Sequence, residues 1–202
     1  MNREIDHIIE VLQSGGAILI ATDTVYGLAA LPTNAAAVSK IYALKGRPAN
    51  MFLPIMVADV ADLERLGLDI NSNARKLLES TLVPGAITFV LGFKVTDFKK
   101  PDWLKMREEI AVRIPDNELL LSILREAGPL LVTSANRHGN QYTPNKVSDI
   151  LKELNGSPDL IIEDGDGREM PSTIINCRTN TPVIERMGVI EANIINEILN
   201  NE

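Results

Sequence analysis

The sequence predicts an α/β protein: a single domain over residues 1–202, with a twisted mixed sheet covered by helices and a concave cleft. Short apolar runs typical of strands alternate with stretches in which apolar residues recur about every 3.6 positions, as on one face of a helix. We find no linker, internal repeat or low-complexity tract that divides the chain. Its hydrophobic and charged fractions, 45% and 23%, are those of a folded globular protein.

The first quarter of the chain should form a helix, a strand and a second helix. Isoleucine and leucine recur at helical spacing near the N-terminus, and Gly15-Gly16 then ends the opening helix. The apolar run 17–21 predicts a strand that is covered on both faces. Asn34 is expected to cap a helix that runs to Leu44 and ends at Gly46.

The rest of the chain continues this alternation. Asp59 and Ser72 are expected to cap short helices. Pro115-Asp116 should cap a helix that ends at Ala127, and Thr143-Pro144 should begin another. The other expected strands are 53–57, 86–91, 110–114, 130–133, 160–163, 173–177 and 183–187, and a closing helix follows around 194–198.

Two segments carry no regular pattern. Residues 93–108 contain four lysines, Pro101 and Trp103 without a clear period, so we expect a surface excursion and assign no site residue to it. The loop 163–170 is rich in glycine and aspartate but lacks the ligand spacing of a calcium-binding hand. We expect this loop to be a flexible flap.

Composition and charge restrict the classes of function. The net charge of −7 argues against a surface that mainly grips a nucleic-acid backbone. One cysteine excludes an internal disulfide, and two histidines leave no clustered soft-ligand metal site. No apolar run approaches the roughly 20 residues that cross a bilayer and no signal peptide is evident, so we expect a cytoplasmic protein. An acidic protein that binds an anion must gather its cations in one cleft.

Two short motifs suit a phosphate ligand. Lys45 and Arg47 are separated by one glycine and followed by Pro48, so both cations can face one anion from a restrained segment. A solvated basic turn at a helix end explains the same spacing. Ser134 and Asn136 follow an apolar strand and can bind phosphate or ribose oxygens, but both residue types are also common in ordinary turns.

Other polar residues have weaker patterns. Asp23 and Thr24 follow the first strand and suit a ligand that carries ammonium and hydroxyl groups, while Tyr26 fits either this site or the core. The sequence contains neither a P-loop nor a dinucleotide-binding glycine pattern, so any nucleotide must be held in another way. Cys177 is expected in the core and His7 on the surface of the first helix.

An ordered series of motifs resembles the YrdC-like family and extends from about residue 15 to residue 190. The motifs are Thr22-Asp23-Thr24-Val25-Tyr26-Gly27-Leu28, Lys45-Gly46-Arg47-Pro48, Pro84-Gly85-Ala86-Ile87-Thr88, Ala111-Val112-Arg113-Ile114-Pro115, Ser134-Ala135-Asn136, Pro171-Ser172-Thr173-Ile174-Ile175 and Ile184-Glu185-Arg186-Met187-Gly188. The resemblance implies the YrdC-like fold, which is similar to that of ribulose-phosphate-derived butanone synthase. Because these motifs occur together and in this order, the family resemblance explains them better than a set of unrelated turns does.

The resemblance implies a nucleotidyltransferase that makes threonylcarbamoyl-AMP and pyrophosphate from L-threonine, bicarbonate and ATP for the t6A modification of transfer RNA. Magnesium would accompany the nucleotide, a threonylcarbamoyl transferase would act next, and transfer RNA is a candidate contact. No protein nucleophile is required, and the chain would supply position and charge. By resemblance Lys45 and Arg47 are catalytic, Lys45, Arg47, Ser134, Asn136 and Arg186 bind ATP, and Thr24, Arg113, Thr133 and Ser172 bind threonine.

The chain departs from the family pattern at two methionines. Met51 replaces the usual polar contact after Lys-x-Arg-Pro, and Met56 stands where many synthases carry a histidine near threonine. Both changes imply a more apolar amino-acid pocket. The alternatives are therefore a YrdC-like paralogue that activates another carbamoyl acceptor, or a non-catalytic module that binds transfer RNA or double-stranded RNA.

Overall fold

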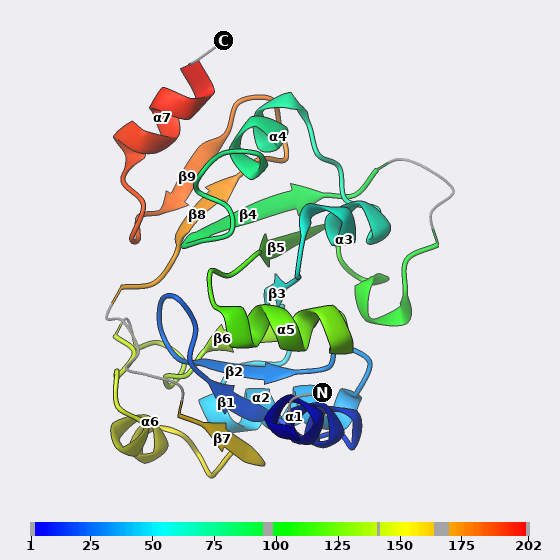
Figure 1. The fold of residues 1–202 in the computed structure, drawn as a ribbon, viewed down its shortest axis with the longest axis vertical. Helices are drawn as coiled ribbons and strands as arrows, with labels where there is room; N and C mark the ends of the chain where they lie inside the picture. The colour runs from blue at the N-terminus through cyan, green and yellow to red at the C-terminus, as the bar shows by residue number, and fades with distance from the viewer. Residues whose placement is uncertain (1–2, 95–98, 141, 164–169, 201–202) are drawn as a thin grey trace.

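The computed structural model describes residues 3–94, 99–140, 142–163 and 170–200. Within these residues nine strands form one mixed sheet in the order β7-β1-β2-β6-β3-β5-β4-β8-β9 (Figure 1). Their bounds are β1 Ile18–Ile20, β2 Gly27–Ala30, β3 Ile55–Met56, β4 Ile87–Gly92, β5 Glu109–Arg113, β6 Leu130–Ser134, β7 Leu160–Ile162, β8 Thr173–Asn176 and β9 Val183–Arg186. The predicted α/β class with a mixed sheet is confirmed.

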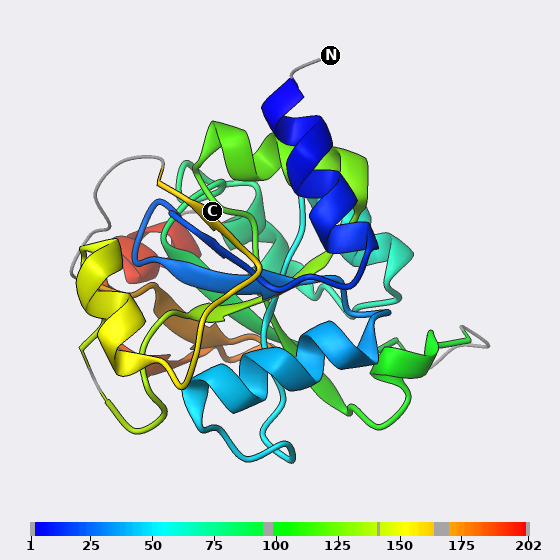
Figure 2. The same ribbon diagram turned by 90° about the horizontal axis from the view of Figure 1, so that it is seen from below.

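Helices cover both faces of the sheet. They are α1 Arg3–Gln13, α2 Ala35–Lys45, α3 Val60–Arg65, α4 Ser72–Leu78, α5 Glu118–Ala127, α6 Val147–Glu153 and α7 Ala192–Asn200, with a short 3₁₀ turn at Asp102–Leu104. Figure 2 shows α1 and α5 on one side of β1 and β2, with α2 on the other. Within the described residues, none of these helices has the length and apolar character needed to cross a membrane.

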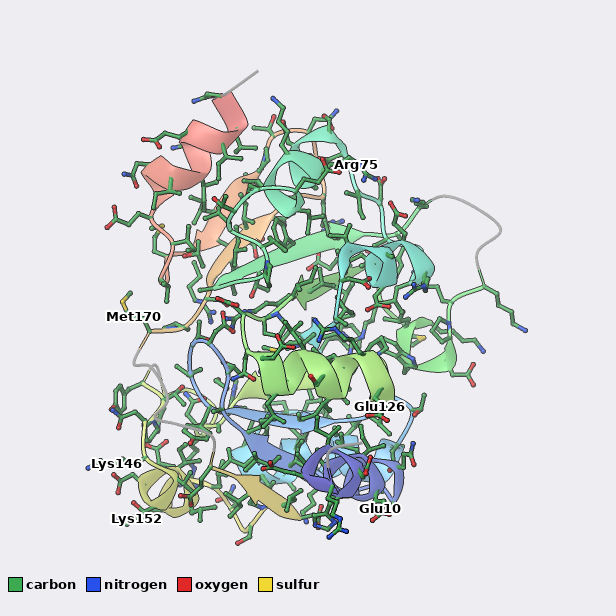
Figure 3. The ribbon with its side chains drawn as sticks, viewed as in Figure 1. Glu10, Arg75, Glu126, Lys146, Lys152 and Met170 are labelled. Atoms are coloured by element: carbon green, nitrogen blue, oxygen red, sulfur yellow. The ribbon has the colours of Figure 1, made fainter. Side chains whose placement is uncertain are left out.

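Two hydrophobic clusters hold these layers together. Ile8 and Leu12 of α1 pack with Leu120 and Leu124 of α5 against the strands β1 and β6. A larger cluster takes Ile41 and Leu44 from α2, Leu77 from α4 and Ile195 from α7, and it runs through Leu28 and Phe89 of the sheet. The charged side chains labelled in Figure 3, such as Glu10, Arg75 and Glu126, project from the outer surfaces of the helices, where they stay hydrated.

Several predicted helix ends are confirmed in detail. The side chain of Asn34 accepts hydrogen bonds from the backbone of Ala36 and Ala37 at the start of α2, and Gly46 ends this helix in the left-handed conformation, with φ of 59°. Asp59 begins α3 with a reciprocal capping box. The resulting short exit from α2 places Lys45 and Arg47 beside the sheet, where the site forms.

Three predicted caps are wrong by one to four residues. Asn71 rather than Ser72 caps α4, because its amide also donates to the backbone carbonyl of Cys177 and is held in place. Asn117 rather than Asp116 caps α5, through a 2.8 Å hydrogen bond from the backbone of Leu120. Helix α6 begins at Val147, not at Thr143-Pro144, after Lys146, which makes no side-chain cap.

The strand β2 was not predicted. Its sequence, Gly27-Leu28-Ala29-Ala30, is poor in β-branched and aromatic residues, so its intrinsic preference for a strand is weak. It forms because β1 and β6 both pair with it in antiparallel register. The strands β1, β7, β8 and β9 are one or two residues shorter than predicted, and β3 is reduced to Ile55–Met56. The strands β4 and β5 are shifted by one residue, and β6 is one residue longer. The predicted flap at 163–170 lies almost wholly outside the described residues.

Candidate active site

A cleft of about 780 Å³ opens along the middle of the sheet and is lined by β3, β4, β5, β6, β8 and β9 and by the loop after β1. Its volume falls within the range of about 300–1,000 Å³ that small-molecule sites occupy. The structure brings eight of the nine predicted site residues to this cleft: Thr24, Arg47, Arg113, Thr133, Ser134, Asn136, Ser172 and Arg186. The ninth, Lys45, lies behind the lining.

Arg113 anchors one end of the cleft. It is the last residue of β5, and the strand alternation that buries Val112 in the core turns Arg113 to the opposite face. Its guanidinium lies 2.7 Å from a carboxylate oxygen of Asp23 and donates to the hydroxyl of Thr24 at 2.7 Å and to the carbonyl of Gly85 at 2.9 Å. Burial lowers the pKa of Arg113 and the Asp23 carboxylate opposes that shift, so the group stays cationic.

Arg186 and Ser172 form the neighbouring wall. Nη2 of Arg186 donates to the carbonyl of Ser172 at 2.8 Å, and the hydroxyls of Ser172 and Thr88 are hydrogen-bonded at 2.7 Å. The backbone at Pro171 approaches Gly188 so closely that a Cβ there would lie 2.2 Å from a carbonyl oxygen, so only glycine fits. This contact joins the two last motifs of the sequence. Burial, and then the nearby Arg113 cation, lower the pKa of Arg186.

Lys45 is buried, with 2% of its surface exposed, and its ammonium has three acceptors. Nζ donates to the backbone carbonyls of Ser134 and Asn136 and to Oδ1 of Asn136. All three protons of the ammonium are therefore used within the protein. Burial is the main cause that lowers the pKa of Lys45 to about 8, and the Arg47 cation adds to it. In this geometry Lys45 holds the turn 134–136 rather than facing the cleft.

The side chain of Asn136 is also used internally. Its Oδ1 accepts from the hydroxyl of Ser134 at 2.7 Å, and its Nδ2 donates to the carbonyls of Asn140 and Tyr142 at 2.6 Å and 3.2 Å. The amide thus joins the end of β6 to the following loop. The Ser134 hydroxyl and the buried Thr133, which both line the cleft, remain as contacts for a ligand.

Arg47 and Arg107 line the cleft beside the segment 52–53. Nη2 of Arg47 donates to the carbonyl of Phe52 at 3.0 Å, and Nη1 of Arg107 donates to the carbonyl of Leu53 at 2.7 Å. The guanidinium of Arg107 also stands 4.6 Å from the centre of the Phe52 ring. Burial lowers the pKa of both arginines.

Arg107 was missed because the segment 93–108 was interpreted as a surface excursion. The described part of the segment, residues 99–108, contains Leu104, which is fully buried. One signal was present: Glu109, Ala111 and Arg113 of β5 line the cleft, and Arg107, which also lines it, continues their two-residue spacing just before the strand begins. This spacing could have marked Arg107 as a candidate.

The two methionines that depart from the family pattern differ in position. Met56 is buried, with 8% of its surface exposed, and lines the cleft, so an apolar side chain does contribute to the pocket. Met51 is 41% exposed and is not among the lining residues, which contradicts its predicted contact with the ligand. The apolar character inferred from both residues therefore rests on Met56.

The described residues contain no group of three or more His, Cys, Asp or Glu side chains that could hold a metal ion. Cys177 is a free, buried thiol whose pKa is raised to about 12 by burial, so it is not a reactive nucleophile.

The fold and the cleft define the class of protein: a mixed α/β protein with a pocket lined by arginine and hydroxyl side chains. The chain belongs to the family of Sua5, YciO and YrdC proteins, whose profile is described as "Telomere recombination" and matches residues 10–188. The resemblance drawn from the ordered motifs is confirmed.

Some relatives within this family are named as threonylcarbamoyl-AMP synthases, and others are named as uncharacterized proteins. A threonylcarbamoyl-AMP synthase of Bacillus subtilis is 35% identical over 89% of this chain, and a putative threonylcarbamoyl-AMP synthase of Methanocaldococcus jannaschii is 35% identical over 88%. An uncharacterized protein, YciO of Escherichia coli, is 29% identical over 93% of this chain. The chain spans 52% of the length of the B. subtilis relative, 82% of the M. jannaschii relative and 90% of YciO.

The similar solved structures likewise include a YciO protein and a Sua5 protein. The crystal structure of E. coli YciO superposes with a TM-score of 0.82, at 28% identity, and covers 95% of this chain and 92% of YciO. The crystal structure of P. abyssi Sua5 complexed with L-threonine superposes with a TM-score of 0.84, at 28% identity, and covers 99% of this chain and 58% of Sua5. Both confirm the YrdC-like fold.

Proposed function

We propose that this chain is an L-threonylcarbamoyladenylate synthase, which forms threonylcarbamoyl-AMP and pyrophosphate from L-threonine, bicarbonate and ATP for the t6A modification of transfer RNA. The observation that carries the proposal is the convergence of eight predicted site residues on one cleft. The synthase names of two relatives and the L-threonine bound to P. abyssi Sua5 support it. A cytoplasmic location and a downstream threonylcarbamoyl transferase belong to the same proposal.

Threonine would bind at the Arg113 end. The guanidinium of Arg113 is held by Asp23 and Thr24, so it can meet the carboxylate of the amino acid without rearrangement. Thr133 and Ser172, both buried and on the lining, offer hydroxyls to the ammonium and side-chain groups. Met56 would contact the methyl group of threonine.

The nucleotide would occupy the remaining length of the cleft. Arg47 and Arg186 would face the phosphates, the Ser134 hydroxyl, which donates to Asn136, would accept from a ribose hydroxyl, and Lys45 and Asn136 would hold the turn that carries Ser134. The threonine amine first captures carbon dioxide or bicarbonate. A carbamate oxygen then attacks the α-phosphorus, the bond to the β-phosphate oxygen breaks, and pyrophosphate leaves with the electron pair. The arginines stabilise the negative charge that develops.

The test is pyrophosphate release from ATP and magnesium, with and without bicarbonate, across a panel of amino acids that includes threonine. Release that requires both threonine and bicarbonate supports the synthase, and Arg113→Gln should abolish it. Arg125→Gln is a matched control, because Arg125 loses the same charge on the exposed surface of α5. Absence of release with every amino acid, although ATP binds, would reject the synthase.

A second candidate is a paralogue that activates another carbamoyl acceptor. Two observations favour it: Met56 puts an apolar side chain in the pocket, and the uncharacterized YciO is matched over nearly its whole length. The same amino-acid panel tests it, because a paralogue would release pyrophosphate with an acceptor other than threonine. Substituting Met56→His should then shift the preference toward threonine.

A further inference from the structure

Arg107 is a buried cation to which neither the motifs nor the proposed function assigns a role. Only 6% of its surface is exposed, and its side chain lines the cleft. Nη1 donates a hydrogen bond to the carbonyl of Leu53, while Nε is buried without a hydrogen-bond partner. A buried N–H group that makes no hydrogen bond is unfavourable unless a ligand or water completes it.

Arg107 also lacks a counter-charge in the part of the chain that the structure describes. Glu109 is two residues away, but its carboxylate pairs with Arg178. The charge of Arg113, the last residue of β5, is neutralised by Asp23. A buried guanidinium is usually paired, because removing its charge from water is unfavourable. Arg107 therefore presents an uncompensated positive charge to the cleft.

Arg47 shares these features with Arg107. Both guanidinium groups donate to consecutive backbone carbonyls, of Phe52 and Leu53, so they lie against the same short segment. Nε of Arg47 is buried and unpartnered as well. Two cations that contact one short segment and line one cleft, each with an unused donor, are suited to an oxyanion with several oxygens and more than one negative charge.

The position along β5 indicates which part of a nucleotide would reach this pair. From Glu109 to Arg113 the strand advances four residues, about 13 Å at about 3.3 Å per residue. Arg107 precedes the first residue of β5, whereas Arg113 is the last residue of that strand. A group bound at Arg107 and Arg47 would therefore be a different part of the ligand from the acceptor that is placed at Arg113.

We propose that Arg107 and Arg47 form a diphosphate-binding subsite, which holds the β- and γ-phosphates of ATP and retains them as the leaving pyrophosphate. The inference rests on the proposed use of ATP but not on the identity of the acceptor. Arg107 thereby favours a nucleoside triphosphate over a monophosphate. Inorganic pyrophosphate is the simplest probe of the subsite, because it contains the diphosphate without the nucleoside.

Titration calorimetry with inorganic pyrophosphate and with AMP tests the subsite in the full chain. Arg107→Gln should weaken pyrophosphate binding about tenfold or more, because a hydrogen bond to a charged group is lost. AMP binding should change by less than about twofold. Arg107→Lys should recover part of the pyrophosphate affinity, since the charge remains. Arg125→Gln, which removes an exposed charge on α5, should bind both ligands like the parent chain.

Three results would overturn the proposal: no pyrophosphate binding by the parent chain, unchanged binding in Arg107→Gln, or an equal loss of AMP and pyrophosphate, which indicates a structural role. The proposal would also be overturned if Arg107→Gln lost binding to a short RNA but kept its binding to pyrophosphate. These measurements need no amino acid, bicarbonate or turnover. Pyrophosphate binding that depends on Arg107 would therefore stand even if no acceptor supported pyrophosphate release.

Discussion

Two buried arginines, Arg113 at the end of β5 and Arg107 just before the start of this strand, have contrasting surroundings. Arg113 is paired with Asp23 and donates to Thr24 and the backbone, so its charge is neutralised before any ligand arrives, although its Nη2 and Oδ1 of Asp23 also lack a hydrogen-bond partner. Arg107 has a carbonyl and an aromatic ring as partners, and no carboxylate among the described residues. Arg113 is therefore preorganised to position a ligand, whereas Arg107 keeps an uncompensated positive charge that a bound anion would neutralise.

This difference has an energetic consequence. A buried ion pair is costly to break, because removal of one partner leaves the other charged and desolvated. A buried cation without a counter-ion already bears that cost in the free protein, and a bound anion relieves it. Substitutions at the Arg113 end should therefore affect folding most, and those at the Arg107 end should affect binding most.

The largest effect is expected for Asp23→Ala. This change removes the carboxylate that neutralises Arg113 and leaves the guanidinium buried, so the free energy of unfolding should fall by about 3–5 kcal/mol. Urea denaturation measures it. Combining Asp23→Asn with Arg113→Gln should destabilise less, since no charge remains unpaired. Arg107→Gln should change stability by less than about 1 kcal/mol, and an equal loss at both ends would contradict the comparison.

The next effect is on binding at the other end. Arg47→Gln should weaken binding of ATP and of pyrophosphate about tenfold to a hundredfold, with little change in the midpoint of urea denaturation. The double variant of Arg47→Gln and Arg107→Gln should lose less than the sum of the single losses, because the two groups contact the same ligand. Strict additivity in calorimetric titrations would indicate that they act on separate ligands.

A pH dependence should arise from Lys45. The pKa of its ammonium is lowered to about 8, so the group loses its proton as the pH rises through this value. A neutral amine has two N–H donors and cannot satisfy all three oxygens of the turn 134–136. Nucleotide affinity should therefore fall above about pH 8.

The matched variant is Lys45→Arg, which stays charged across the whole range. Its nucleotide affinity, measured from about pH 7 to pH 10, should show no decline near the value set by Lys45. A decline of the same size and position in both proteins would assign the titration to another group.

The smallest effect is expected for Arg178→Gln. The pair formed by Arg178 and Glu109 is about half exposed, so its loss should change stability by less than about 1 kcal/mol. Glu109 lines the cleft, and its released carboxylate would add a negative charge near the Arg107 end. Pyrophosphate affinity should fall by about twofold to fivefold at low salt, and the loss should shrink at high salt. Tighter binding would contradict this prediction.

Local signals predicted most of the elements and part of the site. The caps at Asn34, Gly46 and Asp59 depend on side chains that bond to backbone groups within four residues, so they are visible in the sequence. The strand β2 was missed because its glycine and alanines form a strand through pairing with β1 and β6, which are distant partners. Arg107 was missed because its burial, like that of Leu104, depends on tertiary contacts rather than on a local pattern.

The sequence by itself determined the α/β class, the order of most elements and the family, because periodicity, capping and ordered motifs are local properties of the chain. It also predicted Lys45, Arg47, Ser134 and Asn136 as residues of one site. Only the tertiary structure decided their separate roles: Lys45 and Asn136 support the turn at 134–136, and Arg107 joins Arg47 at the cleft. The physical reason is that desolvation and hydrogen-bond partners are set by residues far away along the chain.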